Sequence, residues 1–158
     1  MTAALQLTGG FELERALAEL PRGTSVGVAR RVLKRQLMPV AAMANAFWPG
    51  AEDDVFEVTS RIAGGQMSDS DALRGPGVVN MFVGAAGGPN GAPHAHLVEW
   101  GTGPRYTKAG AYRGSVAPQP MLTPAWAARR PALLRDVGED MFEQIAKTVA
   151  RRAARAKR

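Results

Sequence analysis

The chain has 158 residues, the length of one domain, and its 20 Lys and Arg residues against 14 Asp and Glu residues give a formal net charge of +6. Six of the basic residues lie in the last twelve positions, which hold no acidic residue, so the rest of the chain is balanced; this distribution argues against a cationic nucleic-acid-binding surface over the whole body. Because there is no cysteine, disulfide scaffolds, cysteine-ligated zinc, thiol catalysis and iron–sulfur clusters are excluded.

The hydrophobic residues predict a small core. They make up 46% of the chain, but Leu, Ile, Val and Phe account for only about a fifth of it, so self-association is a natural way to bury more surface. The first residues have neither a basic segment nor a long apolar run, and no apolar run approaches the ~18–20 residues of a membrane-spanning helix. We therefore expect no signal peptide and no membrane contact.

Two helices are predicted in the N-terminal third. Apolar residues recur at helical spacing over residues 11–20, and Pro21 predicts the end of this helix. A second apolar stripe predicts a helix over residues 25–47, with Ser25 as its N-cap and with Pro39 kinking or dividing it.

The middle of the chain is predicted to be extended and rich in loops. Residues 54–62 alternate between apolar and polar, which predicts a strand, and residues 78–85 predict a second one. Residues 64–77 between them are polar, so they form either a flexible loop or a hairpin with a large tip. Residues 64–114 hold 12 of the 18 glycines, and residues 102–118 predict an extended arm.

The last predicted helix starts near Thr123, a suitable N-cap, with Pro124 at the first helical position. Its apolar stripe continues to Val149, with Pro131 as a candidate interruption. Residues 151–158 are only Ala, Lys and Arg, so we expect them to fray or to be ordered by a partner.

No metal site is predicted. His94, His96 and Glu99 are suitable zinc ligands by type. On a strand the two histidines share a face and Glu99 points away, whereas on a helix only His96 and Glu99 share a face. No simple conformation brings the three together, and ordinary packing or capping roles are favoured.

No catalytic or cofactor site is predicted either. Residues 101–105 read GTGPR, but Pro104 removes one of the backbone donors that a phosphate-binding loop needs, so a sharp turn is favoured. No Ser or Thr lies in a nucleophile elbow, and the acidic residues 52–54 are typical of a solvated turn. We predict that the protein is not an enzyme.

Two segments carry a resemblance to a known family. Residues 94–105 (HAHLVEWGTGPR) resemble the A-x-x-V-E-(aromatic)-G-T signature of the neck, or head–tail joining and tail-completion, proteins of HK97-like and lambda-like long-tailed bacteriophages. Residues 118–125 (PQPMLTPA) are similar to the family's second signature, Q-P-(apolar)-(apolar)-x-P-A, which opens the last helix. The resemblance covers residues 10–149. One departure is at residues 48–55 (WPGAEDDV), where the family often has P-x-x-T-G-x-L.

The resemblance implies that the first motif forms a turn used in assembly. It implies that the second motif docks the last helix. The residues that match the first are Glu99, Trp100, Gly101, Thr102, Gly103 and Arg105. The residues of the second are Gln119, Pro120, Met121, Leu122, Pro124, Ala125 and Trp126. As a hypothesis, Glu99 caps backbone N–H groups or pairs with an Arg of the same or a neighbouring subunit, and Arg105 also fixes the turn. Trp100 would anchor the turn in the core, and Met121, Leu122 and Trp126 would dock the helix on the sheet.

The resemblance implies a structural role. Such proteins form rings, here expected as hexamers or dodecamers, between the DNA-filled head and the tail tube of the virion, after synthesis and assembly in the bacterial host cytoplasm. Their partners are the adaptor or stopper, the terminator and the tail tube, with the packaged DNA in the channel as a further contact. Residues 64–77 and 102–118 would be interaction arms that order on assembly. Glu99→Ala is expected to leave the monomer folded but to impair head–tail joining.

The predicted fold is α+β: a small antiparallel sheet flanked by two N-terminal helices and one long C-terminal helix, with long Gly/Pro-rich loops. Residues 1–150 form a single domain and residues 151–158 a basic tail. Two alternatives stay open: a terminator or minor tail protein of the same virion, and a small nucleic-acid-binding protein. The residues that would make that DNA or partner contact are Arg151, Arg152, Arg155, Lys157 and Arg158.

Overall fold

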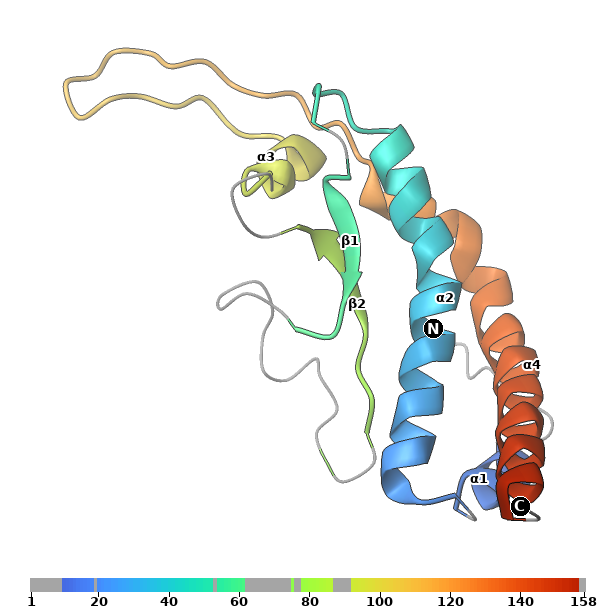
Figure 1. Ribbon diagram of the computed structural model, residues 1–158. Coiled ribbons are helices and arrows are strands. Elements are labelled where there is room, and N and C mark those ends of the chain that lie inside the picture. The colour runs from blue at the N-terminus through green and yellow to red at the C-terminus, as the bar shows by residue number, and fades with distance from the viewer. Residues whose placement is uncertain are drawn as a thin grey trace. The chain divides into compact units, whose positions relative to one another are not determined.

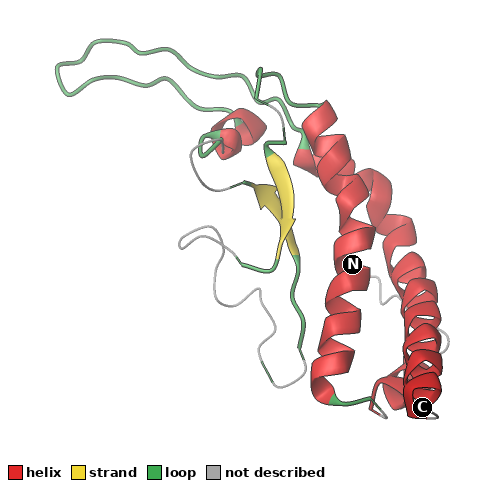
Figure 2. Ribbon diagram, viewed as in Figure 1, coloured by secondary structure: helices red, strands yellow, loops and turns green. Residues whose placement is uncertain are grey.

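The computed structural model describes residues 10–18, 20–52, 54–61, 75, 78–86 and 92–156. The elements are, in order, α1 (Gly10–Ala18), α2 (Arg22–Ala46), β1 (Phe56–Thr59), β2 (Phe82–Ala85), α3 (Ala95–Trp100) and α4 (Leu122–Ala156), as Figure 1 labels them. The α+β class, the long C-terminal helix and the antiparallel pairing are confirmed (Figure 2). The short helix α3 was not among the predicted elements. None of the described helices is long and apolar enough to cross a membrane.

The chain groups into two compact units, and α2 and α4 each contribute a segment to both. We call Met1–Gln36, Ser60–Met81 and Arg130–Arg158 the helical unit. We call Leu37–Thr59 and Phe82–Arg129 the mixed unit. The single domain over residues 1–150 and the separate tail stay predictions. The interaction arm expected over residues 64–77 lies, apart from Gly75, outside the described residues.

The helical unit has a core of residues spaced four apart on two helices. Val28 and Val32 of α2 are fully buried, and Met141 and Ile145 of α4 lie in the same cluster with Leu20. Side chains four residues apart share one face of a helix, so each helix presents one apolar stripe to this core. The apolar periodicity that predicted both helices therefore corresponds to the residues that this core buries.

The start of α2 differs from the prediction. The helix begins at Arg22, because the carbonyl of Pro21 accepts hydrogen bonds from the backbone N–H groups of Thr24 and Ser25 at 2.7 and 3.1 Å. Ser25 is therefore inside the first turn, where its hydroxyl donates to the carbonyl of Arg22 at 2.9 Å, and it is not the N-cap.

Neither internal proline interrupts its helix. α2 is continuous through Pro39, and α4 is continuous through Pro131. A proline removes one backbone hydrogen bond, but buried residues on both sides of Pro39, Val32 and Val40, hold the flanking turns in their respective cores. Residues 151–156 of the basic tail, which were expected to fray or to be ordered by a partner, continue α4 as helix to Ala156.

The core of the mixed unit joins the end of α2 to the sheet. Val40, Ala41 and Ala44 of α2 form one buried cluster with Val55 and Phe56. Asn45 adds a polar link, since its side-chain amide donates to the carbonyl of Phe56 at 3.0 Å and its oxygen accepts from the N–H of Phe56 at 2.7 Å. This pair satisfies backbone groups of β1 that β2 does not reach.

The sheet is shorter than predicted at both strands. In its register Phe56 faces Ala85 and Thr59 faces Phe82. β1 starts at Phe56 rather than at residue 54, because Asp54 has a positive φ of 55° that breaks the extended chain. β2 starts at Phe82 rather than at residue 78, and Phe82 is the register partner of Thr59, the last residue of β1. The predicted end of the first strand, Ile62, lies outside the described residues.

Candidate functional site

The candidate site is built on the short helix α3 of the mixed unit. Ala95 and Glu99 lie four residues apart and are both buried, so they form the inward face of the helix. Trp100 is the next residue, about 100° further around the helix, and it is 72% exposed. The prediction that Trp100 anchors the turn in the core is therefore wrong, because the helix gives the inward position to Glu99.

Glu99 is a buried carboxylate that caps the N-terminus of α4. Its Oε2 accepts from the backbone N–H groups of Met121 at 2.7 Å and Leu122 at 3.0 Å. Its Oε1 accepts from the N–H of Thr123 at 2.9 Å and from the Thr123 hydroxyl at 2.5 Å. The first N–H groups of a helix have no partner within the helix, and the positive end of its dipole favours an anion. Glu99, 7% exposed, therefore satisfies the helix start with its charge.

This arrangement corrects the predicted cap. The chain becomes helical at Leu122, so Thr123 is the second helical residue and Pro124 the third, rather than the N-cap and the first. Thr123 instead donates its hydroxyl to the residue that does the capping. Of the two roles suggested for Glu99, capping of backbone N–H groups is the one observed, and the residues that it caps belong to the second motif.

Burial raises the pKa of Glu99, but the hydrogen bonds from the Thr123 hydroxyl and from the N–H groups of Met121, Leu122 and Thr123 lower it more. The net result is a pKa below the ordinary value of a glutamate. Hydrogen bonds to the charged form therefore outweigh the cost of removing that charge from water.

A pH dependence follows from the lowered pKa of Glu99. Since the folded-state pKa lies below the unfolded one, the stabilisation is complete above the unfolded pKa and is lost as the pH falls through the folded pKa. Chemical denaturation at pH 7 and at pH 3 is expected to show a larger loss of unfolding free energy in the wild type than in Glu99→Gln. An equal loss in both proteins would contradict this prediction, and the comparison cancels the contribution of the other carboxylates.

Gly101 makes the turn that follows α3. Its φ of 71° and ψ of 178° lie in a region that is nearly exclusive to glycine. A Cβ placed there would lie 2.7 Å from the carbonyl oxygen of Val116 and 2.8 Å from the backbone nitrogen of Pro118. Conformation and space both require glycine here, so this motif position is fixed by the backbone. At Gly103, by contrast, a Cβ would meet no atom within 4 Å.

The predicted arm is a two-stranded hairpin rather than an open loop. Thr102 pairs with Val116 at its base through a backbone bond of 2.9 Å and a bond of 3.0 Å from the Val116 N–H to the Thr102 hydroxyl. Tyr106 pairs with Tyr112 further out, and the rings of these two residues lie 5.5 Å apart. Figure 1 shows the two strands of this hairpin running out together beyond α3. We call residues 102–116 the arm.

Arg105 belongs to the arm through its backbone. Its N–H donates to the carbonyl of Gly114 at 3.0 Å, and its carbonyl accepts from the N–H of Arg113 at 2.7 Å. The side chain of Arg105 is exposed and makes no hydrogen bond or ion pair to another described residue. The prediction that its charge fixes the turn is therefore not met in this part of the chain.

Of the three predicted docking residues of the second motif, two pack in or against the core. Met121 is buried, and Leu122 is partly buried against the core of the mixed unit. Trp126 is 42% exposed, and Ala125, which is fully buried, is the inward residue of that turn; the docking of Trp126 on the sheet stays a prediction. The N–H of Gln119 donates to the carbonyl of Val98 at 2.8 Å, which ties the chain before α4 to α3. The prolines Pro120 and Pro124 lie on either side of the capped residues.

The remaining candidates stay apart. His94 is exposed and lies against Trp48 at 5.8 Å between ring centroids, while Glu99 is occupied by α4. No three His, Asp or Glu side chains of the described residues are grouped to hold a metal ion. Glu52 accepts from the Trp48 indole at 3.0 Å, which is the main cause of its lowered pKa.

The basic tail continues α4. Arg151, Arg152 and Arg155 are exposed on this helix, and Lys157 and Arg158 lie outside the described residues. At this spacing Arg151 and Arg155 share a helix face, with Arg152 beside them. The tail therefore presents a cluster of exposed positive charges in the helical unit.

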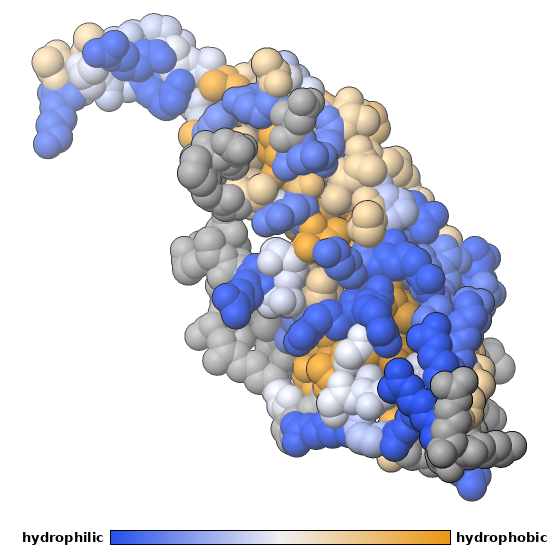
Figure 3. Space-filling model, viewed as in Figure 1, coloured by the Kyte–Doolittle hydropathy of each residue, from blue (hydrophilic) through white to orange (hydrophobic). Residues whose placement is uncertain are grey.

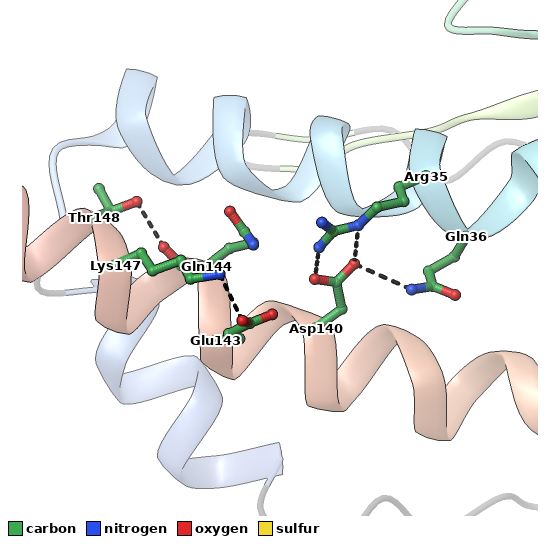
Figure 4. A network of polar contacts seen from close by, with 7 residues as sticks. All are labelled: Arg35, Gln36, Asp140, Glu143, Gln144, Lys147 and Thr148. Atoms are coloured by element: carbon green, nitrogen blue, oxygen red, sulfur yellow. Dashed lines mark hydrogen bonds and ion pairs between the residues drawn. The ribbon is translucent and has the colours of Figure 1, made fainter.

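Sequence reasoning missed one polar cluster, which lies in the helical unit. Asp140 is buried and forms an ion pair with Arg35, and it accepts from Gln36 at 3.1 Å (Figure 4). The acidic spacing on α4 was the available signal, but α2 and α4 are about a hundred residues apart and only the fold joins them.

No protein-family model, curated protein or solved structure matches this chain in the comparisons made.

Proposed function

We propose that the protein is a structural subunit of the neck of a long-tailed phage or of a related particle, and that it joins the DNA-filled head to the tail tube as part of a ring. The observation that carries the proposal is the cap at Glu99. The two segments on which the resemblance rests are 22–24 residues apart at their contact points, and one carboxylate links them through four hydrogen bonds.

The exposed surface supports an assembly role over a catalytic one. The mixed unit keeps Trp100, Trp126, Met38 and Phe47 exposed, and the arm carries two exposed tyrosines. Exposed aromatic residues of this kind are typical of surfaces that a partner covers. Ring closure needs two different patches on each subunit, which fits a chain that exposes Glu139 and Glu143 on α4 and Tyr106 and Tyr112 on the arm. The role requires no metal, cofactor or catalytic residue.

The test uses the phage or prophage that encodes the chain. Deletion of the gene is expected to leave DNA-filled heads and finished tails that stay apart in electron micrographs of the lysate. The wild-type gene supplied in trans restores joined particles, as does the matched control Glu57→Ala, while Glu99→Ala restores fewer. Joined, infectious particles in the absence of the gene would overturn the proposal.

A second candidate function is nucleic-acid binding through the basic tail. The exposed cluster of Arg151, Arg152 and Arg155 on α4 favours it. Binding of duplex DNA should then weaken steeply with salt and disappear when residues 151–158 are deleted. DNA binding that survives this deletion would exclude the tail as the binding element.

A further inference from the structure

The arm is a surface that lacks a partner. Tyr106 and Tyr112 are 64% and 59% exposed, and their rings contact each other. A two-stranded hairpin alone in water is marginally stable. Figure 3 shows mostly hydrophilic and near-neutral residues over the visible side of the arm, so a partner would meet polar and aromatic groups rather than an apolar face.

The charge of the arm is of one sign. It carries Arg105, Lys108 and Arg113, and the sequence has no acidic residue between Glu99 and Asp136. The tyrosine rings lie 5.5 Å apart and are tilted by 57°, so they contact each other without forming a parallel stack. Arg and Tyr are enriched in protein–protein interfaces. These features favour an acidic protein surface as the partner.

The chain itself carries such a surface. An open groove of about 540 Å³ in the helical unit is lined by Asp136, Glu139, Asp140 and Glu143, with Arg35 and Gln36 on its other side. Figure 4 shows that Asp140 is directed at Arg35 and Gln36, which leaves the more exposed carboxylates of α4 as the acidic part of the lining. Glu143 is paired with Lys147 at 2.5 Å, and Glu139 forms a longer ion pair of 4.0 Å with Arg135.

We propose that the arm of one copy docks in this groove on α4 of a second copy, with Arg105, Lys108 and Arg113 against Glu139 and Glu143. The lining carries four carboxylates and one guanidinium, and two further cations, Arg135 and Lys147, pair with its carboxylates, so the groove keeps a net charge of −1. The arm carries +3. Because the two surfaces are different, each copy offers one of each, and the contact is head-to-tail, which closes into a ring if the rotation allows. The inference rests on the proposed ring and names the contact that builds it.

The test is a charge swap between full-length chains. The arm variant carries Arg105→Glu, Lys108→Glu and Arg113→Glu, and the groove variant carries Glu139→Lys and Glu143→Lys. All five side chains are exposed, so both variants are expected to fold, which circular dichroism checks. Each variant alone places like charges in contact and should weaken self-association at least ~10-fold in sedimentation velocity at low salt. An equimolar mixture restores opposite charges at every contact and should assemble.

Matched controls distinguish the effect of this contact from the effect of a changed net charge. Arg15→Glu, Arg22→Glu and Arg30→Glu change exposed basic residues of α1 and α2 and make the same charge change as the arm variant. Glu14→Lys with Glu57→Lys makes that of the groove variant. Both controls should associate as the wild type does.

Three outcomes overturn the inference. They are a wild type that stays monomeric, a groove variant that assembles normally, and a mixture that fails to assemble. Loss of DNA binding in the arm variant alone, with normal assembly, would assign the arm to nucleic acid instead. A ring that persists in the groove variant leaves the neck proposal intact, since that proposal is tested by head–tail joining.

Discussion

Replacing Glu99 with Ala is expected to lower the free energy of unfolding by about 2–4 kcal/mol, because buried backbone donors at the start of α4 lose their acceptor and each such loss costs about 1–3 kcal/mol. The donors concerned are the N–H groups of Met121, Leu122 and Thr123. Water can replace part of the lost hydrogen bonds at the more exposed Thr123. The expected loss of unfolding free energy is therefore smaller than the sum of the three single costs. Urea denaturation at pH 7, followed by circular dichroism, measures the change.

Two further variants show what the stability change of Glu99→Ala means. Glu99→Gln keeps one side-chain oxygen acceptor but loses the charge at the helix N-terminus, so its loss should lie between those of the wild type and Glu99→Ala. Glu57→Ala removes an exposed carboxylate of β1 and should change the free energy by no more than about 0.5 kcal/mol. A Glu99→Ala protein as stable as Glu57→Ala would show that the cap contributes nothing.

Gly101→Ala is expected to cost about 2–4 kcal/mol, since an L residue at this φ is strained by about 1–3 kcal/mol and its Cβ also meets backbone atoms. The nearest of these, the Val116 carbonyl oxygen and the Pro118 nitrogen, are held by the base of the arm and cannot move as a side-chain tip would. The expected relief is a shift of the arm base, with loss of the 2.9 Å bond from the Thr102 N–H to Val116. Thermal and urea unfolding of the variant test the magnitude.

Gly103→Ala is the matched control for that strain. It lies two residues away in the same turn, its φ is not positive, and an added Cβ meets nothing within 4 Å. Its stability should therefore stay within about 0.5 kcal/mol of the wild type. If Gly101→Ala and Gly103→Ala unfold alike, the conformation assigned to Gly101 is wrong.

The sequence alone predicted an element correctly where its apolar periodicity matched the residues that are buried in one core. The apolar spacing of α1, α2 and α4 predicted each helix, and the alternation around Phe56 predicted the first strand. It failed at element ends, because an end depends on groups that are distant in the chain. Ser25 and Thr123 both have the chemistry of an N-cap, but the carbonyl of Pro21 and the carboxylate of Glu99 determine where the two helices begin.

The candidate site shows the same division. The sequence identified Glu99 and Gly101 as a turn with a polar role, and it suggested that Glu99 caps backbone N–H groups. It could not say which groups, and it misplaced Trp100, because a large apolar residue is expected inside and the inward position of α3 belongs to Glu99. The rotation of a six-residue helix decides this, and that rotation is fixed by the packing of α3 and by the four bonds to Glu99.

By itself, then, the sequence determined the α+β class, the helices with clear apolar stripes, the position of the basic residues and the absence of cysteine chemistry. Only the tertiary structure decided the cap on α4, the pairing of the arm and the buried contact of Asp140 with Arg35. Local sequence patterns reflect interactions between residues that are near one another in the chain. These three features depend on hydrogen bonds and charges between segments that folding alone brings together.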